Sequence, residues 1–170
     1  YCVRQFIVVN LIGFNLSWLG LIYWGNAFIP LSLTLLVIHL YFFGHKNNEL
    51  LLVLTITMLG VFVDSLLQYF NVFVFENSFH IPLWLITLWG CFAATISHSL
   101  NFLSRYKILQ LLVGALLAPL SYIAGYKLDA VEFTLPIIST YAVLSIIWGV
   151  LFICFYAIKD ILADIEVSHV

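Results

Sequence analysis

The chain contains 170 residues, of which 64% are hydrophobic and only 8% are charged, and its mean hydropathy is +1.13. A composition this far from that of soluble domains indicates an integral membrane protein. The net charge of −2, with only six Lys and Arg residues, excludes the basic surface that binding to nucleic acid requires.

Apolar runs that are long enough to cross a bilayer follow one another along the chain. They occupy residues 5–25, 28–44, 50–71, 82–104, 107–126 and 134–158, and Gly, Asn, Pro or charged residues separate them. The first run is too long for the apolar core of a cleavable signal peptide, and no A-x-A site follows it, so we expect it to remain a helix. The sequence therefore predicts an all-α, polytopic bundle of six transmembrane helices, forming a single integral-membrane domain over residues 1–170.

The first and third spans carry polar side chains at helical spacing. Asn10 and Asn15 lie in the first span, where they act either as interhelical hydrogen-bonding groups or as one wall of a site. In the third span, Gly60, Asp64 and Gln68 recur every four residues and form one polar face. An ionisable side chain that faces lipid costs at least about 2.5–3.5 kcal/mol, so we expect Asp64 to face the interior of the bundle. There it either ties helices together or takes part in binding or proton movement.

The fourth span contains a histidine among polar neighbours. If residues 82–104 form one helix, Thr95, His98 and Asn101 recur every three residues and share a face that points into the bundle. His98 then either lines a pocket for a lipid head group or a similar small polar molecule, or only hydrogen-bonds between helices. His39, in the second span, is expected in the same leaflet. The two histidines are therefore candidate axial ligands of a haem, a minor alternative to the absence of any cofactor.

The fifth span contains the partner that we expect for Asp64. Tyr122 lies at a similar depth to Asp64, so we predict that the two side chains contact each other or share one polar pocket, with Asn15 as the alternative partner. Pro119 removes a backbone donor within the same span, which predicts a kink beside Tyr122. The kink either lines a cavity or only shapes the packing of the helix.

The basic residues predict how the bundle is oriented. With the start of the chain inside, the inner segments hold Arg4, Lys46, Arg105, Lys107 and Lys159, whereas the outer segments hold only Lys127. Basic residues are enriched on the cytoplasmic side of membrane proteins. We therefore expect both ends of the chain to lie in the cytoplasm.

Four stretches of the sequence together resemble a known family. They read "NLIGFNLSWLG", "LGVFVDSLLQ", "PLWLITLWGCFAATISHSLNFL" and "GALLAPLSYIAGYKLDA". This combination is similar to a family of small bacterial inner-membrane proteins known only as a domain of unknown function, and the likeness covers almost the full chain. Glycine commonly precedes the Pro119 position in that family, whereas Ala118 stands here. The resemblance implies the inner membrane and, through an association with fatty-acid-modifying methyltransferases and photolyase-like proteins, a link to membrane lipid or stress.

Several catalytic and ligand-binding motifs do not occur in the sequence. There is no P-loop, no H-E-x-x-H, no G-x-S-x-G and no paired aspartates for Mg²⁺, so nucleotide, zinc-protease and serine-hydrolase chemistry are not expected. Cys2, Cys91 and Cys154 are far apart and form neither a disulfide framework nor a C-x-x-C motif. The spacing of the residues therefore predicts no metal site.

Three kinds of function remain open. The first is a membrane protein that binds or modifies lipid, as an enzyme or as the accessory of one, with Asp64, His98, Asn101, Tyr122 and Asn15 as the residues of its site. The second is a small proton-coupled transporter in which Asp64 titrates. The third is a structural or accessory membrane subunit. Membrane lipid is the expected partner, and a transporter of this size would need a second copy or another membrane protein to enclose a pathway.

Overall fold

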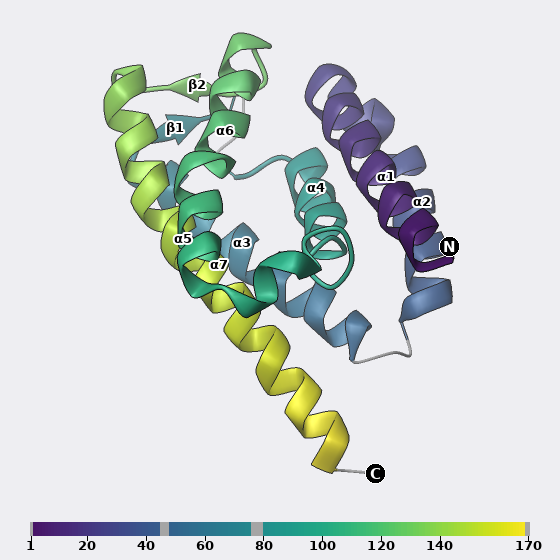
Figure 1. Cartoon of the computed structure of the whole chain (residues 1–170). Coiled ribbons are helices and arrows are strands. Elements are labelled where there is room, and N and C mark those ends of the chain that lie inside the picture. The colour runs from purple at the N-terminus through teal and green to yellow at the C-terminus, as the bar shows by residue number, and fades with distance from the viewer. Residues whose placement is uncertain (1, 45–47, 76–79, 169–170) are drawn as a thin grey trace.

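The computed structural model describes residues 2–44, 48–75 and 80–168, and it is almost entirely helical (Figure 1). Its α-helices are α1 (Cys2–Trp24), α2 (Ile29–Phe43), α3 (Glu49–Tyr69), α4 (Leu83–Ala93), α5 (Lys107–Leu116), α6 (Ala118–Lys127) and α7 (Ile137–Ser168). Short 3₁₀ helices, η1 (Gly25–Phe28) and η2 (Asn101–Arg105), follow α1 and precede α5. The strands β1 (Phe73–Val74) and β2 (Glu132–Phe133) form a small antiparallel pair.

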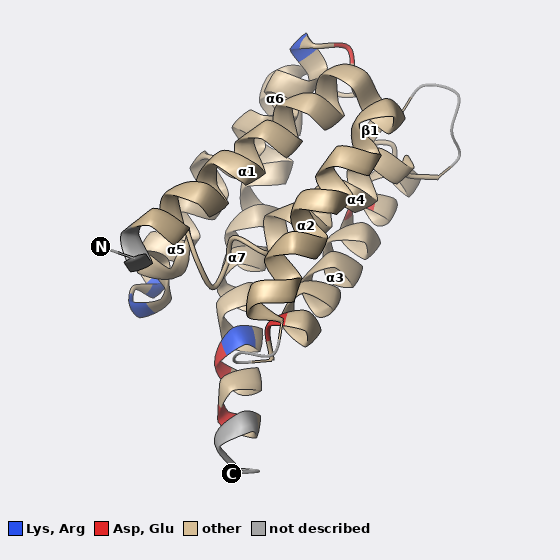
Figure 2. Cartoon of the chain, turned by 90° about the vertical axis from the view of Figure 1, so that its right-hand side faces the viewer, with Lys and Arg blue, Asp and Glu red and all other residues tan. Residues whose placement is uncertain are grey.

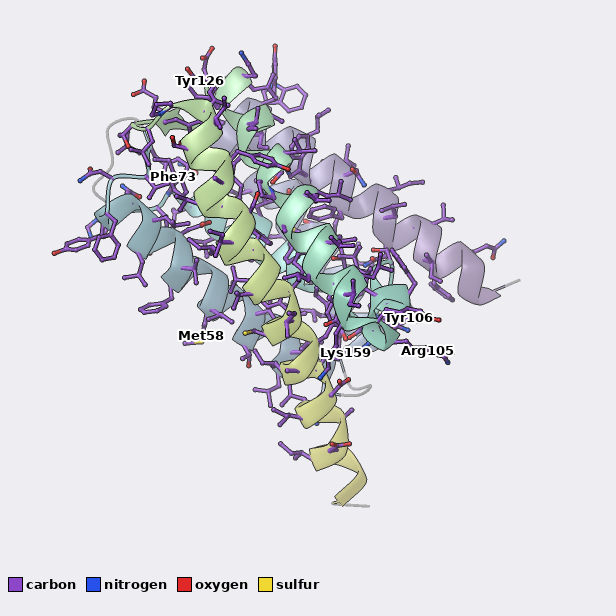
Figure 3. All side chains as sticks on the ribbon, turned by 60° about the vertical axis from the view of Figure 1, so that its left-hand side comes forward. Met58, Phe73, Arg105, Tyr106, Tyr126 and Lys159 are labelled. Atoms are coloured by element: carbon purple, nitrogen blue, oxygen red, sulfur yellow. The ribbon has the colours of Figure 1, made fainter. Side chains whose placement is uncertain are left out.

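Within the described residues, 4 helical stretches are long and apolar enough to cross a membrane. They are Gln5–Phe43, Glu49–Tyr69, Lys107–Lys127 and Ile137–Ile165. Charged residues lie toward the ends of the bundle, and the helices between these ends are almost free of them (Figure 2). Large apolar side chains such as Met58 project outward from the helices (Figure 3). These features are those of a membrane helix bundle.

The first of these stretches is a helical hairpin. Gly25, with φ of +56°, begins the short η1 turn that reverses the chain between α1 and α2. The ring of Phe6, near the start of α1, contacts that of Phe43 at the end of α2, with centroids 5.6 Å apart. The first two predicted spans are therefore two antiparallel helices, although the 15 residues of α2 extend only about 22 Å, less than the hydrocarbon thickness of about 30 Å.

The prediction of one helix over residues 82–104 is wrong. The helix α4 ends at Ala93, and residues 94–100 form consecutive turns before η2 begins. The stretch is rich in Ser, Thr and Asn, whose side chains compete with the helical hydrogen bonds; the Thr95 hydroxyl, for example, donates to the carbonyl oxygen of Phe92 at 2.6 Å. The 11 residues of α4 extend only about 16 Å, so six continuous transmembrane helices are not confirmed.

The predicted disturbance at Pro119 is confirmed as a break between α5 and α6. The break falls at Leu117, two residues before the proline, whose missing N–H removes one helical hydrogen bond. Both helices pack along α7, and a Cβ at Gly114 of α5 would overlap the backbone oxygen of Trp148 on α7. Small residues therefore allow the close approach of these helices.

The loops gather at two opposite ends of the bundle. At one end, Phe73 of β1 pairs with Phe133 of β2, so the segments that follow α3 and α6 lie side by side. At the other end, Lys159 of α7 donates to Asn101 Oδ1, and Asn48 Nδ2, just before α3, donates to the carbonyl oxygen of Leu162 at 2.9 Å. Figure 3 shows Phe73 and Tyr126 toward the first end and Arg105, Tyr106 and Lys159 toward the second.

Candidate functional site

A buried carboxylate ties three helices together in the end of the bundle nearer the strands. Asp64 of α3 is 1% exposed. Its Oδ1 accepts a hydrogen bond of 2.8 Å from the Tyr122 hydroxyl on α6, and its Oδ2 accepts one of 2.7 Å from Nε1 of Trp89 on α4. The predicted contact between Asp64 and Tyr122 is therefore confirmed. We call these three residues the Asp64 cluster.

Trp89 is the member of this cluster that the sequence did not predict. Its indole lies over Gly60, one helical turn before Asp64, and a Cβ at that glycine would overlap the ring. On its other side it stacks on Trp148 of α7, with centroids 5.0 Å apart and planes 5° from parallel. The glycine and the second indole thus fix the ring where its N–H meets the carboxylate.

An apolar cavity lies beside the Asp64 cluster. It has a volume of about 80 Å³, and its walls include Phe14 and Trp18 of α1, Trp84 and Trp89 of α4, and Tyr122 of α6. All of these except Trp89 are half-buried, so the cavity reaches the surface of the bundle. Asp64 is not among the lining residues and lies behind the wall that Trp89 and Tyr122 form. We call this space the aromatic cavity.

The asparagines of the predicted site lie outside the Asp64 cluster. Asn15 is exposed, and its Nδ2 donates to the carbonyl oxygen of Leu11 in its own helix at 2.8 Å, so it is not the partner of Asp64. Asn101 is exposed on η2, where it accepts from Lys159. Asn10, by contrast, reaches across to the turns after α4, where its Nδ2 donates to the carbonyl oxygen of Ala94 at 3.0 Å. It therefore serves as an interhelical hydrogen-bonding group.

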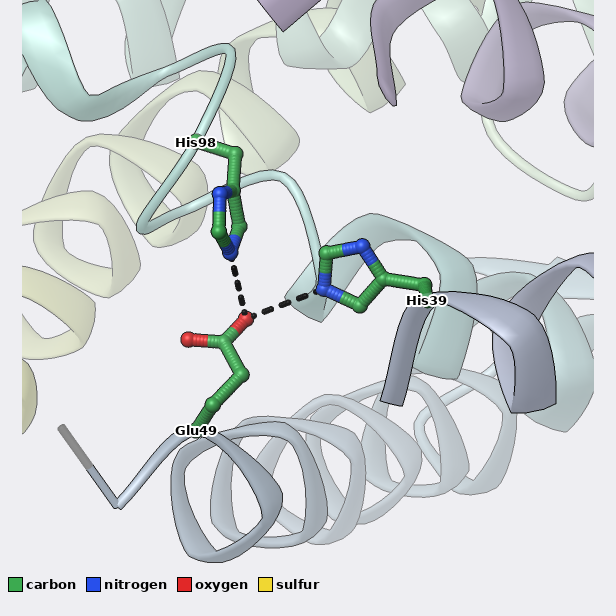
Figure 4. Close-up of side chains that lie close together, drawn as sticks. All are labelled: His39, Glu49 and His98. Carbon is green, nitrogen blue, oxygen red and sulfur yellow. Dashed lines mark hydrogen bonds and ion pairs between the residues drawn. The ribbon is translucent and has the colours of Figure 1, made fainter. Parts of the chain in front are cut away.

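His98 belongs to a second polar cluster, at the opposite end of the bundle (Figure 4). Its Nε2 lies 3.3 Å from Oε1 of Glu49, the first residue of α3, and Nε2 of His39 on α2 lies 3.2 Å from the same oxygen. Glu49 is 2% exposed. We call these three residues the Glu49 cluster. The inward position of His98 is confirmed, but a face shared with Asn101 is wrong because no helix joins the two residues.

The Glu49 cluster bears on two further expectations. It unites three residues of metal-binding type, although the sequence spacing predicted no metal site. The predicted span 50–71 and most of the next one separate Glu49 from His98 in the sequence, so no local motif could reveal their contact. The rings of His39 and His98 touch edge to face, with centroids 4.7 Å apart, and haem ligation by the pair would require them to separate.

Comparison with known proteins places the chain in a family. The family described as "Protein of unknown function (DUF2878)" matches residues 7–154. The chain belongs to DUF2878. The matched part of this DUF2878 protein contains both clusters and the aromatic cavity. No curated protein and no solved structure matches the chain.

Proposed function

We propose that this DUF2878 protein binds the acyl chain of a membrane phospholipid in the aromatic cavity. The observation that carries the proposal is a cavity with aromatic walls that reaches the surface within an apolar bundle. The hydrophobic effect does not drive a lipid chain from the bilayer into an apolar cavity, because both surroundings exclude water. The fit of the chain to the cavity walls and the dispersion contacts that it makes there therefore determine whether it binds. Rigid rings from α1, α4, α6 and α7 supply those contacts, since Trp148 of α7 also lines the cavity.

The Asp64 cluster supports this proposal as a positioning device. Each carboxylate oxygen accepts one bond, from Tyr122 and from Trp89 respectively, and both of these side chains form part of the cavity wall. Asp64 therefore holds the wall without touching the lipid. Both oxygens of Asp64 accept hydrogen bonds, and the side chains of Trp89 and Tyr122 separate them from the cavity. This arrangement favours a fixed hydrogen-bonding role for Asp64 over the release and uptake of a proton that proton-coupled transport needs.

The proposed location is the bacterial inner membrane, with six passes and both ends of the chain in the cytoplasm. The pairing of β1 with β2 supports this arrangement, because the chain must leave that end of the bundle after β1 and return to it before β2. Arg105 and Lys159 lie toward the opposite end, where Lys107 begins α5, and this end would be the cytoplasmic one. Lys46 lies outside the described residues, as does the side chain of Arg4. A C-terminal alkaline phosphatase fusion should be inactive, and strong activity would overturn the orientation.

Native mass spectrometry of the purified protein tests the lipid proposal. Ser121→Leu adds bulk at the wall of the aromatic cavity, so the fraction of chains that retain phospholipid should fall about tenfold, the effect of about 1.4 kcal/mol of lost binding energy. Gly13→Leu is the matched control, because Gly13 lines a different cavity and a Cβ there meets nothing within 4 Å. Equal retention by the wild type and Ser121→Leu would refute the proposal.

The same measurement separates the two ends of the bundle. The lipid site that the sequence suggested around His98 predicts that His98→Ala loses phospholipid, whereas a site in the aromatic cavity predicts that it does not. His98 is not among the residues that line the aromatic cavity, so its removal leaves the proposed binding surface intact. Loss of phospholipid in His98→Ala alone would move the site to the other end.

A further inference from the structure

We propose that His39, Glu49 and His98 bind one divalent transition-metal ion, Zn²⁺ or Fe²⁺. The three residues come from the end of α2, the start of α3 and the turns after α4, and their side chains converge on one point (Figure 4). Two imidazoles and one carboxylate form a ligand set that both metals use in proteins. The inference does not depend on lipid binding, which concerns the other end of the bundle.

The distances within the Glu49 cluster match those between ligands of one ion. One ligand atom from each residue lies within 4.8 Å of the other two. The distances from Glu49 Oε1 to the Nε2 atoms of His39 and His98 are 3.2 and 3.3 Å. Bonds of about 2.0–2.1 Å in tetrahedral geometry place neighbouring ligand atoms about 3.3 Å apart. Two of the three distances therefore fit a bound ion already, and the ligand nitrogens of His39 and His98 lie within 4.8 Å of each other.

The orientation of His98 favours an ion over a purely hydrogen-bonded cluster. Its Nε2 is buried and makes no well-formed hydrogen bond to any group that the structure describes, although Glu49 Oε1 is 3.3 Å away. Nε2 of the Nδ1–H tautomer and the carboxylate oxygen both carry lone pairs, so the two atoms can bind one cation between them. Buried polar atoms without a partner are costly, and a bound cation would satisfy this one together with the carboxylate.

The backbone around the Glu49 cluster is fixed by hydrogen bonds from neighbouring helices. Asn10 of α1 accepts a bond of 3.3 Å at Oδ1 from the N–H of Ser99, next to His98, and the Tyr156 hydroxyl of α7 donates to the carbonyl oxygen of Leu100 at 2.8 Å. Immediately before Glu49, Asn48 has a left-handed backbone conformation with φ of 52°, and its Nδ2 donates to the carbonyl oxygen of Leu162 on α7. Such supporting contacts hold metal ligands in position.

The arrangement leaves a coordination position open. Three protein ligands do not complete a tetrahedral or octahedral shell, which is typical of catalytic rather than structural sites. His39 also lines a cavity of about 220 Å³ between α1 and α2, whose walls include Asn10 and are otherwise mostly apolar. Only His39 of the three ligands lines this cavity, and a water molecule would complete the shell of a bound ion.

Metal titration of the purified chain in detergent tests the proposal. After treatment with a chelator, the wild type should bind roughly one Zn²⁺ per chain, as measured by elemental mass spectrometry. Co²⁺ bound in its place should show the visible absorption of a low-symmetry site. Glu49→Gln and His98→Ala should each weaken binding by more than the roughly 10–100-fold that loss of a supporting residue costs. His80→Ala is the control, because this exposed histidine lies outside the cluster and should leave binding unchanged.

Two results would overturn the metal site. The first is that the wild type binds none of Zn²⁺, Co²⁺ and Fe²⁺, with Fe²⁺ titrated in the absence of oxygen. The second is that Glu49→Gln and His98→Ala bind the metal as tightly as the wild type does. If a variant fails to fold, the wild type remains informative, since Zn²⁺ must raise its melting temperature. Ser121→Leu should bind Zn²⁺ normally, so the failure of lipid binding and the failure of metal binding are distinguished.

Discussion

The two polar clusters of the bundle are built on the same plan but with different chemistry. In each, a buried carboxylate at α3 meets two ring side chains from other segments. Asp64 receives an indole N–H and a phenol O–H, one on each oxygen, and both of these groups serve it as donors. Glu49 meets two imidazole nitrogens at a single oxygen. Imidazole can present a lone pair, so the second cluster can take a metal ion where the first can only hold helices together.

The largest expected effect concerns the Asp64 cluster. Asp64→Leu leaves the Tyr122 hydroxyl and the Trp89 N–H without an acceptor, so the free energy of unfolding should fall by about 2–4 kcal/mol. Asp64→Asn keeps one acceptor oxygen and should cost about 1 kcal/mol. Reversible unfolding in mixed micelles measures both. Ser65→Leu, at the exposed neighbouring position, is the control, and an equal cost for Ser65→Leu and Asp64→Leu would contradict this role.

Zn²⁺ binding should raise the free energy of unfolding through the Glu49 cluster and not through the Asp64 cluster. At a free Zn²⁺ concentration one hundred times the dissociation constant, the wild type should gain about 2.7 kcal/mol. Asp64→Asn should gain the same amount, since its cluster has no part in metal binding, whereas Glu49→Gln should gain almost nothing. Thermal unfolding with and without Zn²⁺ measures the difference. A gain that is equal in Glu49→Gln and the wild type would show that the ion binds elsewhere.

Close approach of α3 and α4 predicts the next effect. A methyl group at Gly60 would overlap the Trp89 indole, so Gly60→Ala should destabilise the bundle by about 1–3 kcal/mol and move the ring away from Asp64. Gly13→Ala is the matched control, because nothing lies within 4 Å of a Cβ at that helical position. The quantity to compare is the unfolding free energy of the two variants, and equal values would refute the close packing.

The smallest expected effect separates two asparagines of α1. Asn10→Ala removes the bonds that hold the turns beside His98 and should cost about 0.5–1.5 kcal/mol. Asn15→Ala removes only a bond within its own exposed helix surface and should change stability by less than about 0.5 kcal/mol. Unfolding in micelles provides the comparison. A larger loss for Asn15→Ala would place this residue in a contact that the present fold does not contain.

The inward position of Asp64 was predictable from the sequence, because the cost of exposing its side chain to lipid decides it. An acid inside an apolar run had to face the bundle, and its depth matched that of Tyr122, so their contact was predictable. Trp89 was not predictable, because an indole in an apolar run gives no sign that its N–H has a buried acceptor. Recognising it would have required the pairing of Gly60 with a large ring on the adjacent helix.

The opposite end of the bundle was less accessible to sequence reasoning. Hydropathy over residues 82–104 does not distinguish a helix from turns whose polar side chains bond locally, and so the helical face assigned to His98 was wrong. Glu49 lies between the second and third predicted spans, where nothing in the local sequence distinguishes it from a solvated charge. Its burial depends on the turns after α4 folding over the start of α3, a long-range contact that no local spacing encodes.

Photo-crosslinking with a phospholipid that carries a diazirine on its acyl chain tests lipid occupancy of the aromatic cavity most directly. Crosslinked peptides should concentrate on the cavity walls, at Trp18 of α1 and at Trp84 of α4, and Ser121→Leu should remove them. Met58, which is 72% exposed on the outer face of α3, reports the background of contact with bulk lipid. Equal labelling at Met58 and at the cavity walls, unchanged in Ser121→Leu, would show that no acyl chain occupies the cavity.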